Sequence, residues 1–493
     1  MRGESRRTAA LASVLLFVLL VAGCTTPSAP PVSPSASGTA ITPPPPFTVT
    51  TTEVPTSYDP AGAQTGADAI VALNVFQRLL IVHSGSPEPK PDAGDCLFKQ
   101  PTVYECTLLK GLVFSNGHAL TASDVKFSIE RAYRLNIAGT SIKLFDSLQR
   151  VEVVDDLTVR FYLSWADNQF GVALATPAAS IVDEDSYDPD KARPNSVKPI
   201  GSGPFALDNV AEDSLTFIRN YTYQGATRAG IDTIRLAFAA DSATVEQAMA
   251  AGTTQVVWRS LDAAALGRLA SGTTRTTMTE IAMPDARVQR LLWNPASELR
   301  GRAEVRAAVA AALEPDRTLT SLVPPTVAGS TASFPAGGRP TATPVPGSRL
   351  NLTPAYSSRA PGPAHLARLL RDRPEGNAGV SVQLKPDASD ADLVLTDAGA
   401  WANTALGWLQ AYTDAPLPGS AAKLAGLTQT ARTLADTAAR QAVLAEIQQQ
   451  AAADATVLPV SLTGETLFVG ADVKVVGDTF GPCWQLGLWG FTR

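Results

Sequence analysis

Residues 110–131, KGLVFSNGHALTASDVKFSIER, decide the fold. The stretch predicts the end of an apolar strand, a tight turn at the Asn-Gly pair 116–117, and then a helix. Thr121 is placed to cap that helix, and Asp124 follows three residues later, where a carboxylate meets the positive end of the helix dipole. Apolar residues at helical spacing predict one buried stripe on the helix: Val125, Ile129 and Ala132.

The N-terminal end carries an export signal. Three arginines precede the uncharged apolar run 8–22, which ends in small residues before Cys24. The pattern predicts a signal peptide over residues 1–23, because the run is shorter than the roughly 20 residues that a membrane span needs. The small residues before Cys24 resemble a bacterial lipobox, which predicts lipidation of Cys24. The alternative is a secreted chain in which Cys24 follows the run by chance. Export by the Sec or the twin-arginine route stays open.

Residues 24–46 are expected to form a stalk. After Cys24 they are mostly Pro, Ser, Thr and Ala and carry no charge. Such a composition cannot bury a core and favours extended, polyproline-like backbone. The stalk would let a lipid-tethered protein reach a partner in the membrane.

The charge balance argues against nucleic acid as a partner. The 493-residue chain has a formal net charge of -6, and removal of residues 1–23, which hold three Arg and one Glu, makes it -8. An acidic, mixed surface also argues against electrostatic adhesion to anionic lipid. The remaining length suffices for two or three domains. No second apolar run is long enough to cross a membrane, so the lipid would be the only anchor.

Two further cysteines predict a disulfide bond. Cys96 and Cys106 bracket the segment DCLFKQPTVYECTL, residues 95–108, which reads as a hairpin. An exported chain meets an oxidising compartment, where neighbouring cysteines pair. Two buried free thiols remain the alternative.

Short motifs spread along the chain resemble, in their order, the oligopeptide-, dipeptide- and nickel-binding class of ABC-transporter solute receptors. Each motif alone is weak, and the shared order carries the resemblance. Tyr58 departs from the family pattern, since Leu is usual at its position. Besides 110–131, the segments are PTSYDPA (55–61), PIGSGPFAL (199–207), LTFIRNYTYQG (215–225), LLWNPA (291–296), AEVRAAVAAALEPDR (303–317) and VLPVSL (457–462).

The resemblance implies an α/β, two-lobed periplasmic-binding-protein-like fold, with a hinge between the lobes and an extra insert domain in lobe one. Lobe one would take residues 47–285, with the insert domain at about 81–197. Lobe two would take 286–464, and the C-terminal tail 465–493 would return to lobe one. The ligand would lie in the cleft, trapped by hinge closure.

The residues offer little for catalysis. The three histidines, His83, His118 and His365, are far apart and lack cysteine companions. A metal site or a histidine-assisted nucleophile therefore has few candidates, and neither enzyme activity nor a metal or cofactor is expected. The acidic run 183–190 is interpreted as a solvated loop, because it lacks the glycine and the terminal glutamate of a calcium loop.

Asp397 and Trp401 are the first candidates for ligand contact. Peptide receptors of this class carry an aspartate in lobe two that pairs with the α-ammonium group of the peptide. Counting from Asp392, that position falls on Trp401, while Asp397 lies four residues earlier. Either Asp397 takes the cation from a shifted register, or the anchor is absent. An unpaired ammonium in a closed cleft costs several kcal/mol, so the choice decides the ligand class.

Aromatic side chains supply the remaining candidates. Trp401, Trp408 and Trp258 can offer stacking faces to apolar, sugar or cationic groups, and Tyr58 stands in the loop that follows the first strand. Packing in a core is the alternative for each tryptophan.

The expected protein is an exported receptor, lipid-anchored to the outer face of the cytoplasmic membrane. It would be a monomer that captures a small peptide or peptide-like solute and delivers it to an ABC permease. One alternative is a receptor-like lipoprotein that has lost transport and acts through envelope protein partners. An alternative of another class is a secreted hydrolase.

Overall fold

The computed structural model describes residues 46–82, 88–338, 349–360, 363–476, 480–481 and 485–493. The predicted signal peptide and Cys24 lie outside these residues, as does the stalk up to residue 45. Residues 46–493 form one compact unit. Among the described residues, no helix combines the length and the apolarity that crossing a membrane requires.

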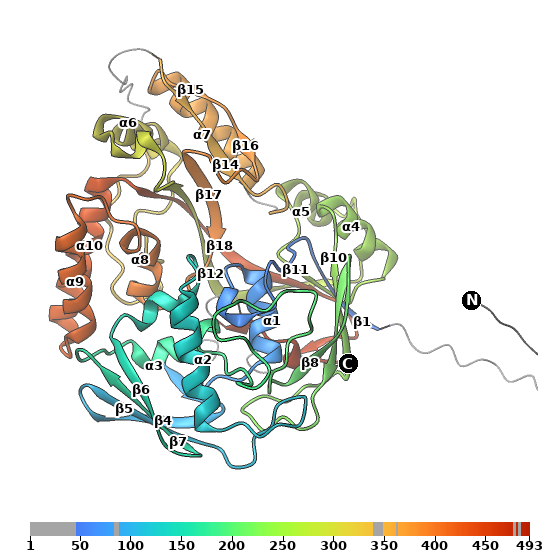
Figure 1. Ribbon diagram of the computed structural model, residues 1–493. Helices are drawn as coiled ribbons and strands as arrows, with labels where there is room; N and C mark the ends of the chain where they lie inside the picture. Colours follow the sequence, from blue (N-terminus) through green and yellow to red (C-terminus); the bar gives the residue numbers. More distant parts are fainter. Residues whose placement is uncertain (1–45, 83–87, 339–348, 361–362, 477–479, 482–484) are drawn as a thin grey trace, which may run out of the picture. The chain divides into compact units, whose positions relative to one another are not determined.

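The central element of the described residues is a ten-stranded mixed sheet of order β16-β14-β17-β12-β18-β11-β1-β10-β9-β8 (Figure 1). The long strands β12 and β18 pair antiparallel with each other, and β18 also pairs with β11 while β12 pairs with β17. These two strands therefore connect both halves of the sheet. The strands are β1 (Phe47–Thr51), β8 (Phe205–Ala211), β9 (Ser214–Arg219), β10 (Thr233–Phe238), β11 (Val256–Trp258), β12 (Thr279–Trp293), β14 (Pro354–Tyr356), β16 (Lys385–Pro386), β17 (Leu393–Ala398) and β18 (Val457–Val469).

A first hydrophobic core, which we call the lobe-one core, packs around β1, β10 and α1 (Gly66–Val75). Thr65 and Asp68 close a reciprocal capping box at the start of α1. The C-terminal residues join this core, because Asn74 accepts a hydrogen bond from the Leu488 amide at 2.8 Å. Helices α4 (Ser242–Ala251) and α5 (Ala263–Ala270) add a smaller apolar cluster with β11 and β18.

A second core, the insert core, lies between a four-stranded sheet of order β4-β5-β7-β6 and α2 (Ala122–Leu135). The predicted turn and helix are confirmed: α2 begins after Thr121, with a capping box to Asp124, and Val125 and Ile129 are buried. The strands are β4 (Gly94–Gln100), β5 (Val103–Leu108), β6 (Leu148–Asp155) and β7 (Thr158–Leu163). Cys96 and Cys106 face each other across β4 and β5 and form a disulfide bond with their Cα atoms 4.1 Å apart.

The third core, the lobe-two core, packs helices against β12, β17 and β18. Its helices are α6 (Ala303–Leu313), α7 (Pro363–Asn377), α8 (Ala405–Thr413), α9 (Ala421–Thr433) and α10 (Thr437–Asp454). Figure 1 shows α8, α9 and α10 together on one side of the long strands.

Short elements complete the described part. They are α3 (Phe170–Ala173) and the strand pairs β2 (Leu80–Val82) with β3 (Pro89–Pro91), β13 (Asn351–Leu352) with β15 (Ser381–Val382), β19 (Lys474–Val475) with β22 (Phe491–Thr492), and β20 (Phe480–Gly481) with β21 (Gln485–Leu486).

The interpretation of residues 183–190 as a solvated loop is wrong for Asp183. This side chain is buried and accepts hydrogen bonds from Asn116 Nδ2 at 2.6 Å and Ser186 Oγ at 2.5 Å, and His118 Nδ1 lies 3.0 Å from the same oxygen. The carboxylate therefore ties the Asn-Gly turn before α2 to the acidic run. A carboxylate without a calcium-loop pattern can still be recruited as a structural acceptor, which the sequence pattern did not indicate.

Candidate functional site

The ends of parallel strands from both halves of the sheet come together at one place. Strands β1, β10 and β11 run parallel on the lobe-one side, and β14 and β17 run parallel on the lobe-two side. In open α/β sheets, ligands bind beyond the carboxyl ends of such strands. Arg259 follows directly after β11, and Asp397 stands at the end of β17. These two residues therefore mark the candidate site.

A cavity of about 310 Å³ lies here, with walls from β11, α5, β12, β17 and β18. Its volume is at the lower end of the range for small-molecule sites, which suits a ligand the size of a dipeptide. Its apolar wall residues include Val257, Leu261, Leu266 and Phe468. Its polar wall residues include Arg259, Glu280, Arg287, Gln289, Asp397 and Thr463.

Asp397 is held by polar side chains from the two long strands. Its Oδ1 lies 3.6 Å from Arg287 Nε and accepts from Thr463 Oγ1 at 3.4 Å, and its Oδ2 accepts from Gln289 Nε2 at 3.3 Å. The register places these groups together, since Gln289 pairs with Asp397, and Arg287 pairs with Thr463. The carboxylate side chain is 5% exposed, so its negative charge faces the Arg287 guanidinium with little water between them.

Arg259 joins the two sides of the cavity. Its Nη2 donates to the backbone oxygen of Asp397 at 2.9 Å, and its Nε lies 3.8 Å from Glu53 Oε1. The backbone of Arg259 has a positive φ of 48°, which is uncommon for a residue with a side chain. The side chain runs past Gly66, where a Cβ atom would come within 3.1 Å of both Arg259 Nη1 and the Trp258 ring. A glycine at the start of α1 thus leaves room for the arginine.

The other predicted ligand residues lie outside the wall of this cavity. Trp258 is 1% exposed in the lobe-one core, and the Arg259 guanidinium lies 5.2 Å from its ring centre. Trp408 is 3% exposed in the lobe-two core and donates from Nε1 to Asn403 Oδ1 at 2.9 Å. Tyr58 is buried in the lobe-one core, and burial raises the pKa of its hydroxyl. Their roles as ligand contacts stay predictions.

Trp401 lies between β17 and α8, where it reaches the insert domain. It is partly buried, and its Nε1 donates to the backbone oxygen of Gly139 at 3.1 Å. The tryptophan therefore holds the loop after Asp397 against the segment after α2. Trp401 is not among the residues that line the cavity, and its role as a ligand contact stays a prediction.

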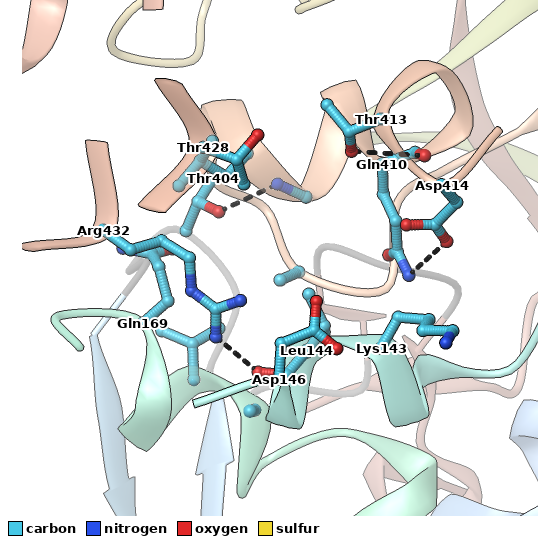
Figure 2. Close-up of a pocket in the computed structure, with 15 residues that line it drawn as sticks. Lys143, Leu144, Asp146, Gln169, Thr404, Gln410, Thr413, Asp414, Thr428 and Arg432 are labelled. Atoms are coloured by element: carbon cyan, nitrogen blue, oxygen red, sulfur yellow. Dashed lines mark hydrogen bonds between the residues drawn. The ribbon is translucent and has the colours of Figure 1, made fainter. Parts of the chain in front are cut away.

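A second interface links the insert domain to lobe two (Figure 2). Arg432 of α9 is buried and forms a two-point ion pair with Asp167, with Nε–Oδ1 at 3.0 Å and Nη2–Oδ2 at 2.5 Å. Its Nη2 also donates to the backbone oxygen of Leu144 at 2.6 Å. Beside it, a small space of about 40 Å³ has Lys143 and Asp146 on one side and Gln410 and Asp414 on the other. The interface thus gathers charged groups from both parts.

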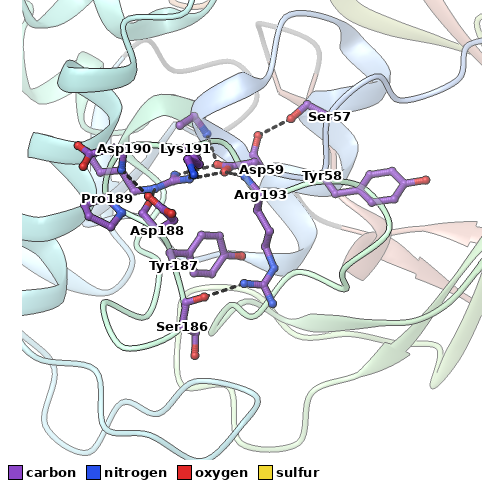
Figure 3. A network of polar contacts seen from close by, with 12 residues as sticks. Ser57, Tyr58, Asp59, Ser186, Tyr187, Asp188, Pro189, Asp190, Lys191 and Arg193 are labelled. Carbon is purple, nitrogen blue, oxygen red and sulfur yellow. Dashed lines mark hydrogen bonds and ion pairs between the residues drawn. The ribbon is translucent and has the colours of Figure 1, made fainter.

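A buried polar network fixes the loop between β1 and α1 (Figure 3). Asp59 accepts from Arg131 Nη1 at 3.1 Å and Nη2 at 2.6 Å, and from the Arg193 amide at 2.7 Å. Arg131 donates further to the backbone oxygens of Asp188 and Lys191. Because both charges are 1% exposed, loss of either partner would leave the other buried without compensation. The network connects α2 to the loop that leads into the candidate site.

Sequence reasoning missed Arg259, Arg287 and Glu53. A single arginine or glutamate beside a strand carries no local signal of its own. Sequence analysis singled out Trp258 as a possible stacking face, and the next residue along the chain, Arg259, is the one that lines the cavity.

Comparison with known proteins gives a consistent picture. Residues 98–453 match the bacterial extracellular solute-binding proteins, family 5 (Middle). The chain is 28% identical over 227 residues to di/tripeptide-binding protein 1 of Pseudomonas aeruginosa, covering 41% of this chain and 42% of that protein. It is 26% identical over 185 residues to the glutathione-binding protein GsiB of Pectobacterium atrosepticum, covering 36% and 34%. The chain is thus matched over less than half the length of these curated relatives.

Solved structures show the fold. The periplasmic binding protein DppA from Helicobacter pylori, in complex with peptide STSA, aligns with a TM-score of 0.76 at 17% identity, covering 90% of this chain and 97% of that one. The binding protein AgaA from A. tumefacien R10, in complex with agropinic acid, aligns with a TM-score of 0.76 at 16% identity, covering 90% and 98%. The chain therefore has the two-lobed α/β fold of periplasmic binding proteins, as the sequence predicts.

Proposed function

Since the chain belongs to the bacterial extracellular solute-binding proteins of family 5, we propose that it captures a peptide or peptide-like solute by closure of its two lobes and delivers it to an ABC permease. The observation that carries the proposal is the cavity at the strand ends. Its walls come from β11 and α5 on the lobe-one side, from β17 on the lobe-two side, and from the long strands β12 and β18. The relatives named for dipeptides, tripeptides and glutathione support a solute of this class.

The contact from Arg259 to the Asp397 backbone gives a physical basis for closure. One residue follows a lobe-one strand and the other lies near the end of a lobe-two strand, so we expect the hydrogen bond to respond to movement of one lobe against the other. A charge-assisted hydrogen bond of this kind contributes about 1.5 to 3 kcal/mol at most. That amount biases an open–closed equilibrium without locking it, so a ligand with contacts to both lobes can decide the population.

The two arginines of the cavity could bind an acceptor group of a solute, while Glu280 and Asp397 balance their charge. Arg259 and Arg287 both line it, and a carboxylate entering it would meet two guanidinium groups. Asp397 could bind an ammonium group only in competition with Arg287, whose Nε lies 3.6 Å away. The ammonium anchor is therefore weaker here than a freely available carboxylate would be, and N-blocked or non-peptide acids become plausible ligands.

Export and lipid anchoring complete the proposal. Cys24 would carry the lipid, residues 24–46 would act as the stalk, and the receptor would work as a monomer at the outer face of the cytoplasmic membrane. It would perform no chemistry and need no cofactor. Residues 47–285, with the insert domain at about 81–197, would form lobe one together with the tail 465–493, and residues 286–464 would form lobe two.

Calorimetry with a dipeptide and its N-acetylated form tests the proposal. We expect one binding site per chain for Ala-Ala or for acetyl-Ala-Ala, and at least tenfold weaker binding in Arg287→Gln. Arg302→Gln serves as the matched control, because Arg302 is paired with Glu304 away from the cavity. Mass spectrometry of solutes released from the purified protein extends the search beyond peptides. If neither dipeptide form binds and no peptide-like solute is released, the transport proposal fails and a receptor-like role without transport is favoured.

A further inference from the structure

Lobe two contains another cavity, of about 340 Å³, on the side of the sheet covered by α8. Leu292, Val394 and Thr396 form its sheet wall, and Ala411 and Ala415 form its helix wall. Val394 precedes Asp397 by three residues, about 10 Å along the strand, and their side chains point to opposite faces of the sheet. The sheet therefore separates this cavity from the candidate ligand site.

The far end of this cavity is formed by three buried residues with unused hydrogen-bonding atoms. Trp293, Arg300 and Thr456 are 3%, 8% and 2% exposed. Trp293 Nε1, Arg300 Nε and Thr456 Oγ1 have no hydrogen-bond partner within the described part of the chain. Buried donors are paired almost everywhere in native proteins, and one left alone costs about 1 to 3 kcal/mol.

The charge around this end is positive. Arg300 uses Nη2 to bind the backbone oxygen of Ala415, just after α8, and Arg306 binds the backbone oxygens of Asp454 and Arg300. Burial lowers the pKa of both guanidinium groups, and Asp454 opposes this effect. The Asp454 carboxylate itself accepts from Tyr412 and Gln450. Within the described residues, neither arginine makes an ion pair; Asp454 balances part of their charge, and an anion could still pair with Arg300.

We propose that lobe two carries a second ligand site, distinct from the inter-lobe cavity, that takes a small organic anion with an apolar body. The acid group would accept hydrogen bonds from Arg300, Trp293 and Thr456, and the body would lie against Leu292 and Val394. A cation is disfavoured by the arginines, and water alone is held poorly by a wall that is mostly apolar. This inference goes beyond transport, since the site does not contact the inter-lobe cavity.

The probe for the test is 4-fluorobenzoate, a planar carboxylate with an apolar ring. Titration into the purified full-length receptor, with excess acetyl-Ala-Ala present to occupy the inter-lobe cavity, is expected to show one saturable site by ¹⁹F NMR and calorimetry. 4-Fluorobenzamide, which keeps the shape and loses the charge, is expected to bind about tenfold more weakly. Thr456→Val removes one hydrogen-bonding group with little change in shape and should weaken benzoate binding about fivefold. Trp293→Phe removes the indole N–H together with part of the ring and should weaken it at least as much.

Further variants separate the site from its surroundings. Ala411→Leu fills the cavity without touching a donor and should abolish binding even if the donor variants fold poorly. Arg302→Gln, two residues from Arg300 and solvent-facing, and Asp397→Asn in the other cavity should leave it unchanged. The proposal is overturned if probe binding survives Ala411→Leu or is lost in Asp397→Asn. It is also overturned if binding does not saturate at 10 mM probe, a concentration about 100 times a dissociation constant of 0.1 mM. The last result would mean that the cavity holds water alone.

Discussion

Arg432 and Asp167, 265 positions apart in the sequence, form a two-point ion pair that joins lobe two to the insert domain. Ser147 Oγ donates to the same carboxylate at 2.6 Å, and the Trp165 ring lies 5.0 Å from the guanidinium carbon. Asn168 adds a backbone hydrogen bond to the Arg432 carbonyl oxygen. The pair is almost fully buried, so its partners depend on each other. We therefore expect a movement of lobe two to involve the insert domain as well as lobe one.

Removal of the guanidinium should open this interface. We expect Arg432→Gln to destabilise the interface by about 3 to 5 kcal/mol, because it leaves the Asp167 carboxylate buried without a partner. Solute affinity should fall and the solution radius of gyration should rise, as measured by calorimetry and small-angle scattering. The matched control is Arg440→Gln, whose guanidinium binds only backbone oxygens of the α9–α10 connection. Unchanged affinity and radius in Arg432→Gln would show that the ion pair plays no part in closure.

The disulfide between Cys96 and Cys106 should stabilise the insert domain. Closing a loop with a sequence separation of 10 contributes about 2 to 3 kcal/mol in the chain-entropy account. The double variant Cys96→Ala/Cys106→Ala should lower the free energy of unfolding by that amount. The measurement is urea denaturation of the exported protein. Reduction of the wild type should reproduce the shift and leave the variant unaffected. Equal stability of oxidised and reduced wild type would contradict the prediction.

Lipidation should depend on Cys24. Cys24→Ala removes the sulfur to which the acyl chains would attach, so mature protein should move from the detergent phase to the aqueous phase in Triton X-114 partitioning. Ser28→Ala in the stalk is a matched control that keeps the cysteine. A Cys24→Ala protein that is processed and still partitions with detergent would sink the anchor hypothesis.

The insert interface should respond to acid. Burial, followed by the nearby Asp146 carboxylate, raises the pKa of Asp414 to about 6, while Gln410 and Lys143 oppose the rise. Burial also raises the pKa of Asp146, against Arg432 and Lys143. The folded state therefore holds a proton that the unfolded chain would release between about pH 4 and 6. Stability from Asp414 is present below this window and is lost as the pH rises through it.

The Asp414 effect is measured as a difference between variants. The residue keeps more than a third of its surface exposed, so solvent screening reduces the shift. Asp414→Asn should raise the unfolding midpoint at pH 7.5 and change it little at pH 4.5. Asp208→Asn, at an exposed strand residue outside this interface, is the matched control. Identical pH profiles for wild type and Asp414→Asn would contradict the assignment.

Local sequence signals predicted individual helices and strands, whereas the candidate ligand site depends on the pairing register between distant strands. Helix α2 was foreseen because Thr121 and Asp124 specify a capping box within four residues, and that geometry needs no distant partner. Arg287 enters the site only because β12 and β18 pair so that Arg287 opposes Thr463, and β17 then sets Asp397 beside them. A register between strands more than 100 residues apart has no signature in either strand alone. Trp408 was recognised as a possible core residue. Its burial could not be decided from the sequence, because it also depends on packing partners that are distant in the chain.

Two substitutions separate the two ligand classes left open by Asp397 and Trp401. If the solute is a free peptide, Asp397 must exchange part of its contact with Arg287 for the α-ammonium group. Asp397→Asn should then weaken binding by roughly 2 kcal/mol or more, through loss of a charge-assisted contact. If the solute has no ammonium group, the same variant should change affinity little, because Arg287 becomes more available to an acid group.

Trp401→Ala provides the complementary measurement. Its Nε1 bond to Gly139 holds the loop after β17, and its ring, although outside the cavity wall, stays a predicted stacking face for a bound solute, so the variant should cost on the order of 1 to 3 kcal/mol for either class. Trp401→Phe keeps the ring and loses the hydrogen bond, and so divides stacking from loop positioning. Calorimetry of all three variants uses Ala-Ala and acetyl-Ala-Ala, or the released solute. If none of the three changes the affinity for any of these, the solute binds elsewhere and the strand-end cavity is not the ligand site.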